Sequence, residues 1–414
     1  MKAFRILAGM SILLAAQVAS LAGPAEDYVD AQLRVVKGLE EQVEGLARIA
    51  DEAARRLLAG GKLYLAGERG MVLELHVRAG GLCSTHVYQR AKTQLAANDV
   101  VLLSDYGARP HSGNARVEEL ELSEELCRSP ALVFAFAFER HPMLTQLPLK
   151  AVPLKLSYDS RLVQAPSGER FVPAATPAVA IGQWAFVAEL IGACRRQGKQ
   201  LAVYLSIHLD EGRKRFERTK GLVFEPDLKP EPAPAGQFAK EFLGHVRSAL
   251  EAVRKDEAPK IRTAAEWLRK AKAEGKKVVR HLYGHMPPAE AGLLGDPAQL
   301  FTGTVTGPVA EKGVEWIRRN LGQGDVYLLV GYQQNEDAMA EAANKLGARS
   351  IFLTSLAPGA EQAKNPLHLY VNPHWPLTDA CLDLPGYDVK ACPLSGILGL
   401  TAYYAICAEA IAPK

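Results

Sequence analysis

The residues best suited to chemistry follow short apolar runs, at the points where strands would end. Glu74 and Arg78 stand four positions apart after the first run, a spacing that pairs opposite charges on one face of a helix. His285 follows a run in the second half, where it can act as an acid or a base or donate a hydrogen bond. Its alternative is a capping role, because the Met-Pro-Pro segment at 286–288 is typical of the first turn of a helix.

A second group of polar side chains follows the next apolar run of the first half. Ser104, Tyr106 and Arg109 form it, and a guanidinium such as that of Arg109 can bind a phosphate or carboxylate through two parallel hydrogen bonds. Asp105 would repel such an anion, so a polar turn without a ligand is the alternative.

Three hydroxyl groups of the second half occupy comparable positions. Thr354 and Ser355 close one apolar run, and Ser395 opens the last apolar stretch. A hydroxyl in such a place can donate to a ligand or can cap the segment that follows. These three residues complete the candidate ligand-binding set, to which Arg78 also belongs.

The chain repeats one order of elements in its two halves. Residues 28–67 and 238–284 each read as two amphipathic helices, a Gly-Lys pair, an apolar strand and a glycine. Asp99 and Asp325 then lead a second apolar strand in each half. Self-similarity of this kind indicates that one structural unit has been duplicated.

Apolar strands that alternate with helices indicate parallel sheets covered on both faces. The fold class is therefore α/β, with two tandem doubly wound parallel-sheet domains, and ligands are expected at the carboxyl ends of the strands. We expect domain 1 over 24–224 and domain 2 over 237–414, each closing with a long apolar helix, over 179–194 and 397–411. The Pro-rich stretch 225–236 would join them as a stiff, extended linker.

The first 22 residues are typical of a secretory signal peptide. Lys2 and Arg5 precede an apolar run from 6 to 22 that ends in small residues. We expect cleavage and export to the periplasm or the medium, with an uncleaved membrane anchor as the alternative. No later segment holds the roughly 18 uninterrupted apolar residues of a membrane span, so we expect a soluble mature chain without membrane contact.

Composition argues against several classes of function. The net charge of +3 gives no electrostatic basis for binding nucleic acid. The six cysteines show no metal-ligand spacing, and His368, His374 and Asp379 fall on separate loops, so no metal site is expected. Only Cys381 and Cys392 are close enough for a local disulfide. Neither a Walker loop nor a dinucleotide-binding fingerprint is present, so we expect no cofactor.

One string carries a resemblance to a known family. The stretch 74–82, ELHVRAGGL, resembles the E-x-x-x-R-A-G-G-L segment of a single-copy sugar-isomerase (SIS) domain family. That family is related to the phosphosugar-binding domains of N-acetylmuramic acid 6-phosphate etherase and glucosamine-6-phosphate synthase. In the second half, 324–355 resembles the family's strand-loop-helix-strand core, and 393–396 resembles the start of its last helix. The chain thus resembles two tandem SIS domains, which have a flavodoxin-like or Rossmann-like fold.

The resemblance implies a small-molecule ligand, either a sugar or a phosphosugar. It makes Glu74 the best candidate for the base that an aldose-ketose isomerisation needs, while a structural ion pair with Arg78 is the alternative. His285 is the second catalytic candidate. SIS domains commonly dimerise, so two copies in one chain can form an internal pseudo-dimer, and a homodimer of whole chains stays open.

The sequence departs from the family at its phosphate-binding loop, S-x-S-G. The first half keeps Ser104 and Gly107, whereas the segment 331–335 of the second half keeps neither serine. We therefore expect an exported SIS-type protein that binds a sugar derivative or phosphosugar, and the eroded loop leaves open whether it is catalytically degenerate. An active phosphosugar isomerase or lyase with Glu74 as base, and a non-catalytic structural protein, are the alternatives.

Overall fold

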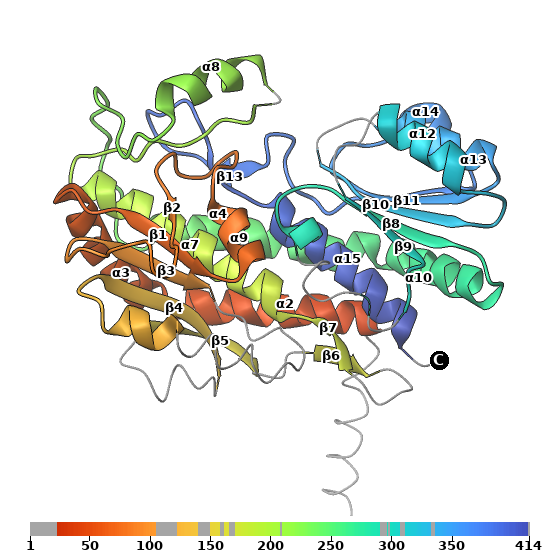
Figure 1. Cartoon of the computed structure of the whole chain (residues 1–414), viewed down its shortest axis with the longest axis horizontal. Coiled ribbons are helices and arrows are strands. Elements are labelled where there is room, and N and C mark those ends of the chain that lie inside the picture. Colours follow the sequence, from red (N-terminus) through yellow and green to blue (C-terminus); the bar gives the residue numbers. More distant parts are fainter. Residues whose placement is uncertain are drawn as a thin grey trace, which may run out of the picture.

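The computed structural model describes residues 23–104, 122–139, 150–157, 161–164, 170–207, 209–289, 296, 299–306, 311–332 and 336–412. Within these residues, two sheets lie at opposite ends of the molecule, and long helices run between and beneath them (Figure 1). The signal peptide expected at 1–22 lies outside the described residues.

Each end of the molecule holds a five-stranded parallel sheet. The first has the order β2-β1-β3-β4-β5, and the second, read from one edge, has the order β9-β8-β10-β11-β12. Counted along each half, both orders read 2-1-3-4-5, which confirms the doubly wound parallel arrangement predicted from the sequence. The strands are β1 Leu63–Gly67, β2 His86–Val87, β3 Val100–Ser104, β4 Leu132–Glu139 and β5 Lys150–Ser157 in the first sheet, and β8 Val278–Leu282, β9 Gly303–Thr306, β10 Val326–Val330, β11 Arg349–Leu353 and β12 His368–Val371 in the second.

The aspartates that lead β3 and β10 make the same hydrogen bonds in both halves. Asp99 accepts the N–H of Lys62 at 2.9 Å, and Asp325 accepts the N–H of Lys277 at 2.9 Å. The other oxygen of each carboxylate accepts a backbone N–H three residues earlier, at 2.8 Å in both cases. Each aspartate therefore fixes the start of its own strand against the start of the neighbouring strand.

Helices cover both sheets, as the alternating sequence pattern predicts, and α8 is an addition that the pattern did not reveal. The helices are α2 Pro24–Glu40, α3 Val43–Leu58, α4 Arg69–Leu75, α7 Ala175–Arg196, α8 Asp210–Thr219, α9 Gln237–Ala252, α10 Ala258–Ala273, α12 Glu311–Asn320, α13 Asp337–Lys345, α14 Ala360–Ala363 and α15 Ser395–Ile411, and a π-helical segment, Val253–Glu257, joins α9 to α10. The stretch 225–236 between α8 and α9 contains neither helix nor strand.

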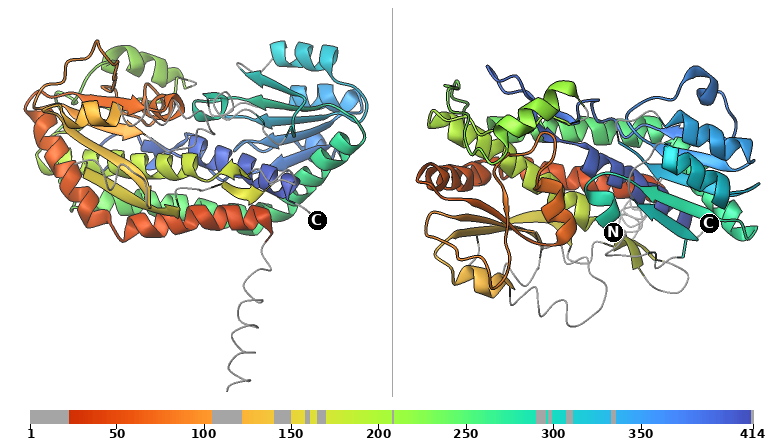
Figure 2. Two further views of the ribbon diagram at one scale, coloured as in Figure 1. Left: turned by 60° about the horizontal axis from the view of Figure 1, so that its bottom comes forward. Right: turned by 45° about the horizontal axis from the view of Figure 1, so that its top comes forward.

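The first helix of each half packs against the closing helix of the other half. Helix α2 lies along α15, and α9 lies along α7. The left-hand view of Figure 2 shows α2, in red, running along the base of the molecule. Glu189 of α7 accepts the N–H of Gly236 at the start of α9 at 2.8 Å, and Glu409 of α15 accepts the N–H of Ala25 in α2 at 3.4 Å. The domain boundaries expected from the sequence, 24–224 and 237–414, stay a prediction. The first helix of each half packs on the closing helix of the other half, so the packing does not follow these boundaries.

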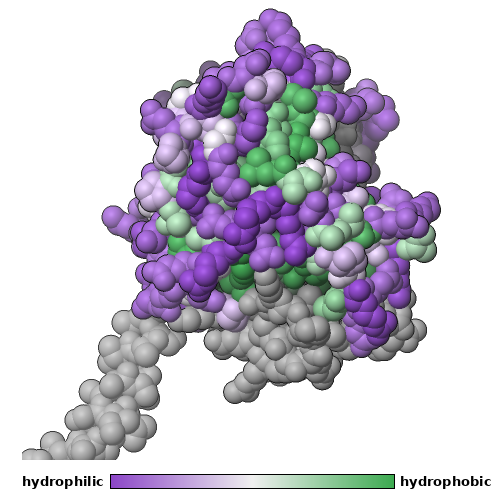
Figure 3. Space-filling model, turned by 90° about the vertical axis from the view of Figure 1, so that its left-hand side faces the viewer, coloured by the Kyte–Doolittle hydropathy of each residue, from purple (hydrophilic) through white to green (hydrophobic). Residues whose placement is uncertain are grey.

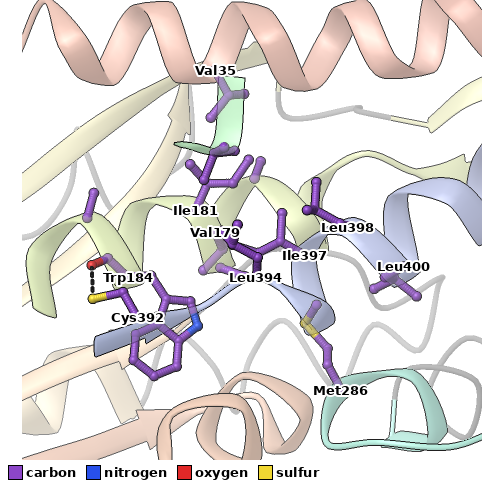
Figure 4. Packing of buried hydrophobic residues seen from close by; sticks show 14 of the residues in the cluster. Val35, Val179, Ile181, Trp184, Met286, Cys392, Leu394, Ile397, Leu398 and Leu400 are labelled. Atoms are coloured by element: carbon purple, nitrogen blue, oxygen red, sulfur yellow. Dashed lines mark hydrogen bonds between the residues drawn. The ribbon is translucent and has the colours of Figure 1, made fainter. Parts of the chain in front are cut away.

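One large hydrophobic cluster extends across both halves, and three smaller clusters lie beside it among the described residues. The cluster runs from Ala25 in α2 to Ala410 in α15. Figure 4 shows Val35 of α2, Ile181 of α7 and Ile397 of α15 within it. The two closing helices therefore belong to the interior and hold the two sheets in a fixed relation.

Helix α7 is apolar enough and long enough to cross a membrane, the one such helix among the described residues. The window that meets this criterion is completely buried within the protein. Its hydrophobicity is therefore explained by its position in the core, where Gly182 allows the ring of Phe136 to approach closely.

The ribbon of β13 Ala380–Leu382 and β14 Ala391–Pro393 is antiparallel, as is the ribbon of β6 Arg161–Gln164 and β7 Arg170–Pro173. The disulfide considered for Cys381 and Cys392 is not formed, and both buried thiols are free. Cys381 Sγ donates to the Cys392 carbonyl at 3.2 Å, whereas Cys392 Sγ faces the Trp184 carbonyl at 3.8 Å. The two sulfur atoms are thus directed at different partners.

Hydrophilic side chains cover most of the left-hand face, and the hydrophobic side chains that interrupt them include a patch in its upper part (Figure 3). Among the described residues, the exposed large apolar side chains are those of Val77, Val87, Ile207, Leu209 and Leu377. Val77 and Ile207 lie at the cavity described next.

Candidate functional site

A cavity of about 700 Å³ lies between the two halves. The second half contributes residues that directly follow β8 and β10, so the cavity adjoins the carboxyl edge of the second sheet, where doubly wound proteins bind ligands. The first half contributes the segment after α4, the segment 204–207 and one face of α8. The lining residues are Val77, Arg78, Ala79, Tyr204, Leu205, Ser206, Ile207, Arg213, Phe216, Glu217, Tyr283, Gly284, His285, Tyr332 and Ser395.

The ELHVRAGGL segment brings Arg78 against the second half because its glycines allow close packing. Gly80 has a φ of +73°, and a Cβ atom there would lie 2.8 Å from the Cβ of Ala380. The Gly80 N–H donates to the Tyr204 carbonyl at 2.8 Å, and the Gly80 carbonyl accepts the N–H of Cys392 at 2.9 Å. Glycine alone adopts this conformation without strain and leaves room for the β13–β14 ribbon.

Arg78 is the centre of a buried polar cluster that joins the halves. Its guanidinium contacts the carboxylate of Glu74, lies 2.8 Å from Asp379 Oδ2 and donates to Ser395 Oγ at 3.0 Å. Trp184 Nε1 donates to Glu74 Oε1 at 3.0 Å. The side chains of Glu74 and Asp379 are 0% exposed and that of Arg78 is 2% exposed, so water screens these charges very little.

Asp379 connects this cluster to the N-terminus of α15. Its Oδ1 atom accepts the N–H groups of Leu394 at 3.0 Å and Ser395 at 2.7 Å. Its Oδ2 atom accepts the hydroxyls of Ser395 at 2.9 Å and Tyr332 at 3.0 Å. Asp379 therefore caps α15 from 16 positions earlier in the chain and satisfies N–H groups that have no partner within the helix.

Glu74 lies behind Arg78 and does not line the cavity. Burial raises the pKa of its carboxyl group, against the opposing effects of the Arg78 charge and the Trp184 hydrogen bond. The sequence prediction placed the Glu74–Arg78 pair on one helix face, and this is wrong because α4 ends at Leu75. The pair forms instead where the chain leaves α4 and turns towards the second half. Gly396 makes room for it, since a Cβ atom there would lie 2.5 Å from both carboxylate oxygens of Glu74.

His285 lines the cavity and is solvent-exposed, although protein atoms also lie close to its imidazole. Its Nδ1 atom lies 3.3 Å from the Leu73 carbonyl. Burial lowers the pKa of His285 to about 4, and the nearby charge of Arg78 acts in the same direction. The imidazole is therefore neutral near pH 7 and can exchange hydrogen bonds with an uncharged ligand.

Aromatic and apolar side chains form much of the remaining wall. Tyr204 and Phe216 stack with their ring centroids 5.1 Å apart, and Tyr283 and Tyr332 line the side that belongs to the second half. Burial raises the pKa of Tyr332, with the Asp379 carboxylate acting in the same direction, so its hydroxyl stays protonated. The wall offers flat rings and neutral hydroxyls to a ligand.

The structure brings three of the sequence candidates together at the cavity and leaves others outside it. Arg78, His285 and Ser395 line the cavity. Tyr106 and Arg109 lie outside the described residues.

The remaining candidates, Ser104, Thr354 and Ser355, do not line the cavity. Ser104 is buried and accepts a hydrogen bond from Gln183 Nε2. Thr354 Oγ1 donates to the Tyr332 carbonyl at 2.8 Å, and Ser355 Oγ is a buried atom that has no hydrogen-bond partner among the described residues.

Sequence reasoning missed Asp379, Tyr332 and Trp184. Asp379 was noticed only as one of several scattered polar residues, because its partners lie far away in the chain. Its φ of +65°, which is rare for a residue other than glycine, cannot be read from the sequence. Among the described residues, no group of three or more His, Cys, Asp or Glu side chains is arranged to hold a metal ion.

No protein-family model matches the chain, and no curated protein matches it. Among solved structures, the chain is similar to the C-terminal domain of glucosamine-fructose-6-phosphate aminotransferase from Francisella tularensis, with 10% identity, a TM-score of 0.44 and coverage of 92% of this chain and 98% of that one. It is also similar to a phosphoheptose isomerase from Francisella tularensis, with 14% identity, a TM-score of 0.29 and coverage of 41% of this chain and 94% of that one. TM-scores this low say nothing about the activity of this chain. The fold class rests instead on the strand order of the two sheets.

Proposed function

We propose that this protein is an exported SIS-type protein, built from two copies of one domain, that binds a sugar derivative between its halves. The cavity beside the carboxyl edge of the second sheet is the single observation that carries the proposal. Its size suits a small ligand, since ligand cavities of about 300–1,000 Å³ are usual. The ELHVRAGGL resemblance and the shared strand order of the two sheets support the SIS assignment.

A sugar suits the chemistry of the wall. Its hydroxyl groups can exchange hydrogen bonds with Ser206, His285 and Ser395, while its C–H faces can lie on the rings of Phe216 and Tyr283. Val77 and Ile207 at the margin add apolar surface for a substituent. The mixture of rings and neutral polar groups favours a ligand of the same mixed character.

The buried polar cluster around Arg78 favours binding of the ligand without turnover. A general base must come within hydrogen-bonding reach of the proton it removes. Glu74 is fully buried, paired with Arg78 and bound by Trp184. An isomerase with Glu74 as base is the second candidate, and it needs Arg78 to move so that the raised pKa of Glu74 can serve a substrate.

Export is proposed from the sequence of residues 1–22 alone. Expression with the natural N-terminus and N-terminal sequencing of the exported product would test it. A cleaved chain outside the cytoplasm supports the proposal, and an intact chain in the membrane fraction contradicts it.

Calorimetric titration of the chain from residue 23 with free sugars, amino sugars, phosphosugars and cell-wall fragments tests the binding function. We expect one class to bind, and Phe216→Ala to weaken that binding at least tenfold by removing a ring from the wall. Phe224→Ala is the matched control, because Phe224 is also half-buried and does not line the cavity. Equal binding by both variants, or no binding by any sugar class, contradicts the proposal and favours a structural role.

A further inference from the structure

The N-terminus of α15 forms the part of the cavity wall where an anionic ligand would be expected to bind. Free N–H groups and the positive end of the helix dipole usually make such a position attractive to phosphate. In this protein a carboxylate already occupies it. Asp379 Oδ1 accepts the N–H groups of both Leu394 and Ser395, and Asp379 Oδ2 accepts the Ser395 hydroxyl.

A second carboxylate lies against the same helix end. Glu74 fills the space above Gly396, since a Cβ atom there would lie 2.5 Å from both of its carboxylate oxygens. Arg78 lies between Glu74 and Asp379 and contacts both. Two carboxylates and one guanidinium leave no positive charge in excess, and all three side chains are buried where charges are poorly screened.

The other charged side chains of the described lining do not change this balance. Arg213 and Glu217 both lie on α8 and carry opposite charges. The remaining titratable groups of that lining are His285 and three tyrosines, which are neutral near pH 7. A phosphate group at the α15 end of the cavity would approach the buried Asp379 carboxylate behind Ser395, with no uncompensated cation beside it in the described lining.

We infer that the cavity selects an uncharged sugar derivative over its phosphate ester, and that Asp379 is the residue that determines this selection. The inference rests on the proposed sugar-binding function and specifies its ligand class. The carboxylate takes the hydrogen bonds that a phosphate would need, and its charge repels the phosphate.

Matched pairs of ligands that differ by one phosphate test the inference. Calorimetric titration would compare N-acetylglucosamine with N-acetylglucosamine 6-phosphate, and fructose with fructose 6-phosphate. We expect at least one free sugar to bind at least tenfold more tightly than its ester. An ester that binds as tightly as its free sugar, or more tightly, overturns the inference and leaves the sugar-binding function standing. A complete absence of binding across the broad panel above overturns both.

Asp379→Asn tests the role of the carboxylate itself. The amide oxygen can still accept the N–H groups of Leu394 and Ser395, while the negative charge beside Arg78 is lost. We expect the variant to bind the ester at least tenfold more tightly than the natural chain does, with a smaller change for the free sugar.

Asp383→Asn is the matched control, because Asp383 is 75% exposed and pairs with Lys390 at the surface. This substitution should change neither the affinity for the ester nor the affinity for the free sugar. An Asp379→Asn variant that folds, as shown by circular dichroism, but gains no affinity for the ester overturns the assignment to Asp379. If the variant does not fold, the comparison of matched ligands on the natural chain still decides the inference.

Discussion

Arg78 and Asp379, which lie 301 positions apart in the sequence, form a buried ion pair of 2.8 Å that joins the two halves of the protein. Each belongs to a segment that contributes to the candidate site. Arg78 lines the cavity, and Asp379 fixes the start of α15 behind it. The same contact therefore contributes to the packing of the halves and to the shape of the cavity.

Removing Arg78 should be far more destabilising than removing a surface arginine. Arg78→Met leaves Glu74 and Asp379 buried without their cation, which should lower the free energy of unfolding by about 3–5 kcal/mol. Arg128→Met is the control, because Arg128 pairs with Glu124 in water and its loss should cost less than about 1 kcal/mol. Urea unfolding followed by circular dichroism measures both changes. Equal effects would show that the buried cluster stabilises the protein no more than an exposed ion pair does.

Glu336 should make the protein less stable as the pH rises. Its carboxyl group is buried with no hydrogen-bond partner among the described residues, and burial raises its pKa from 4.5 to about 8. Between these values the folded state keeps a proton that the unfolded state has released, so stability falls as pH rises through this window. Above pH 8, the ionised carboxyl group of Glu336 lowers the free energy of unfolding by on the order of 5 kcal/mol.

Glu336→Gln tests this prediction because the amide cannot ionise. We expect the variant to be more stable than the natural chain at pH 9 and the difference to shrink towards pH 4.5, in thermal unfolding measured at several pH values. The same substitution at Glu341, an exposed residue of α13 paired with Lys345, should leave the pH dependence almost unchanged. A constant difference between Glu336→Gln and the natural chain at all pH values would contradict the assignment.

A methyl group at position 396 should disturb the polar cluster. Glycine to alanine in a helix usually stabilises a protein by up to about 1 kcal/mol. Gly396→Ala should do the opposite, because the new Cβ atom would lie 2.5 Å from the Glu74 carboxylate oxygens, and overpacking of this kind costs about 1–3 kcal/mol.

Gly244→Ala in α9 is the control for this substitution, because a Cβ atom there meets nothing within 4 Å. Denaturant unfolding of the two variants should therefore give changes of opposite sign. Stabilisation by both would mean that Glu74 moves aside without cost.

The sequence was sufficient to predict the inner strands β1, β3, β4, β8, β10 and β11, because each carries its own local signal, whereas the outer strands β2, β5, β9 and β12 were not predicted. The Gly-Lys pairs, the apolar runs and the leading aspartates are all short-range features, and Asp99 and Asp325 make matching hydrogen bonds as their positions suggested. The closing helices were equally clear, because α7 and α15 are apolar over nearly their whole length.

The cavity could be predicted only in part, because its wall combines distant segments. Arg78, His285 and Ser395 were selected for their residue types and their places after strands or before a helix. Asp379 shows its role only when the β13–β14 ribbon brings it beside α15, and Ser104 turned out to be bonded within the core. No local pattern specifies such long-range contacts.

The first helix of each half packs on the closing helix of the other half, and we therefore predict that neither half folds alone. A fragment of residues 23–224 lacks α9, which covers α7, and a fragment of residues 237–414 lacks α2, which covers α15. Each fragment would expose an apolar helix face and lose the capping of a helix N-terminus by Glu189 or Glu409.

We therefore expect each separate fragment to lack a cooperative unfolding transition and the mixed fragments to form a one-to-one complex that regains it. Circular dichroism and analytical ultracentrifugation measure these properties. Proteolytic cleavage of the intact protein within 225–236 is the control, because a folded chain cut there should keep its two parts associated. Two fragments that each melt cooperatively as monomers would contradict the prediction, since each half would then have to bury its closing helix by itself.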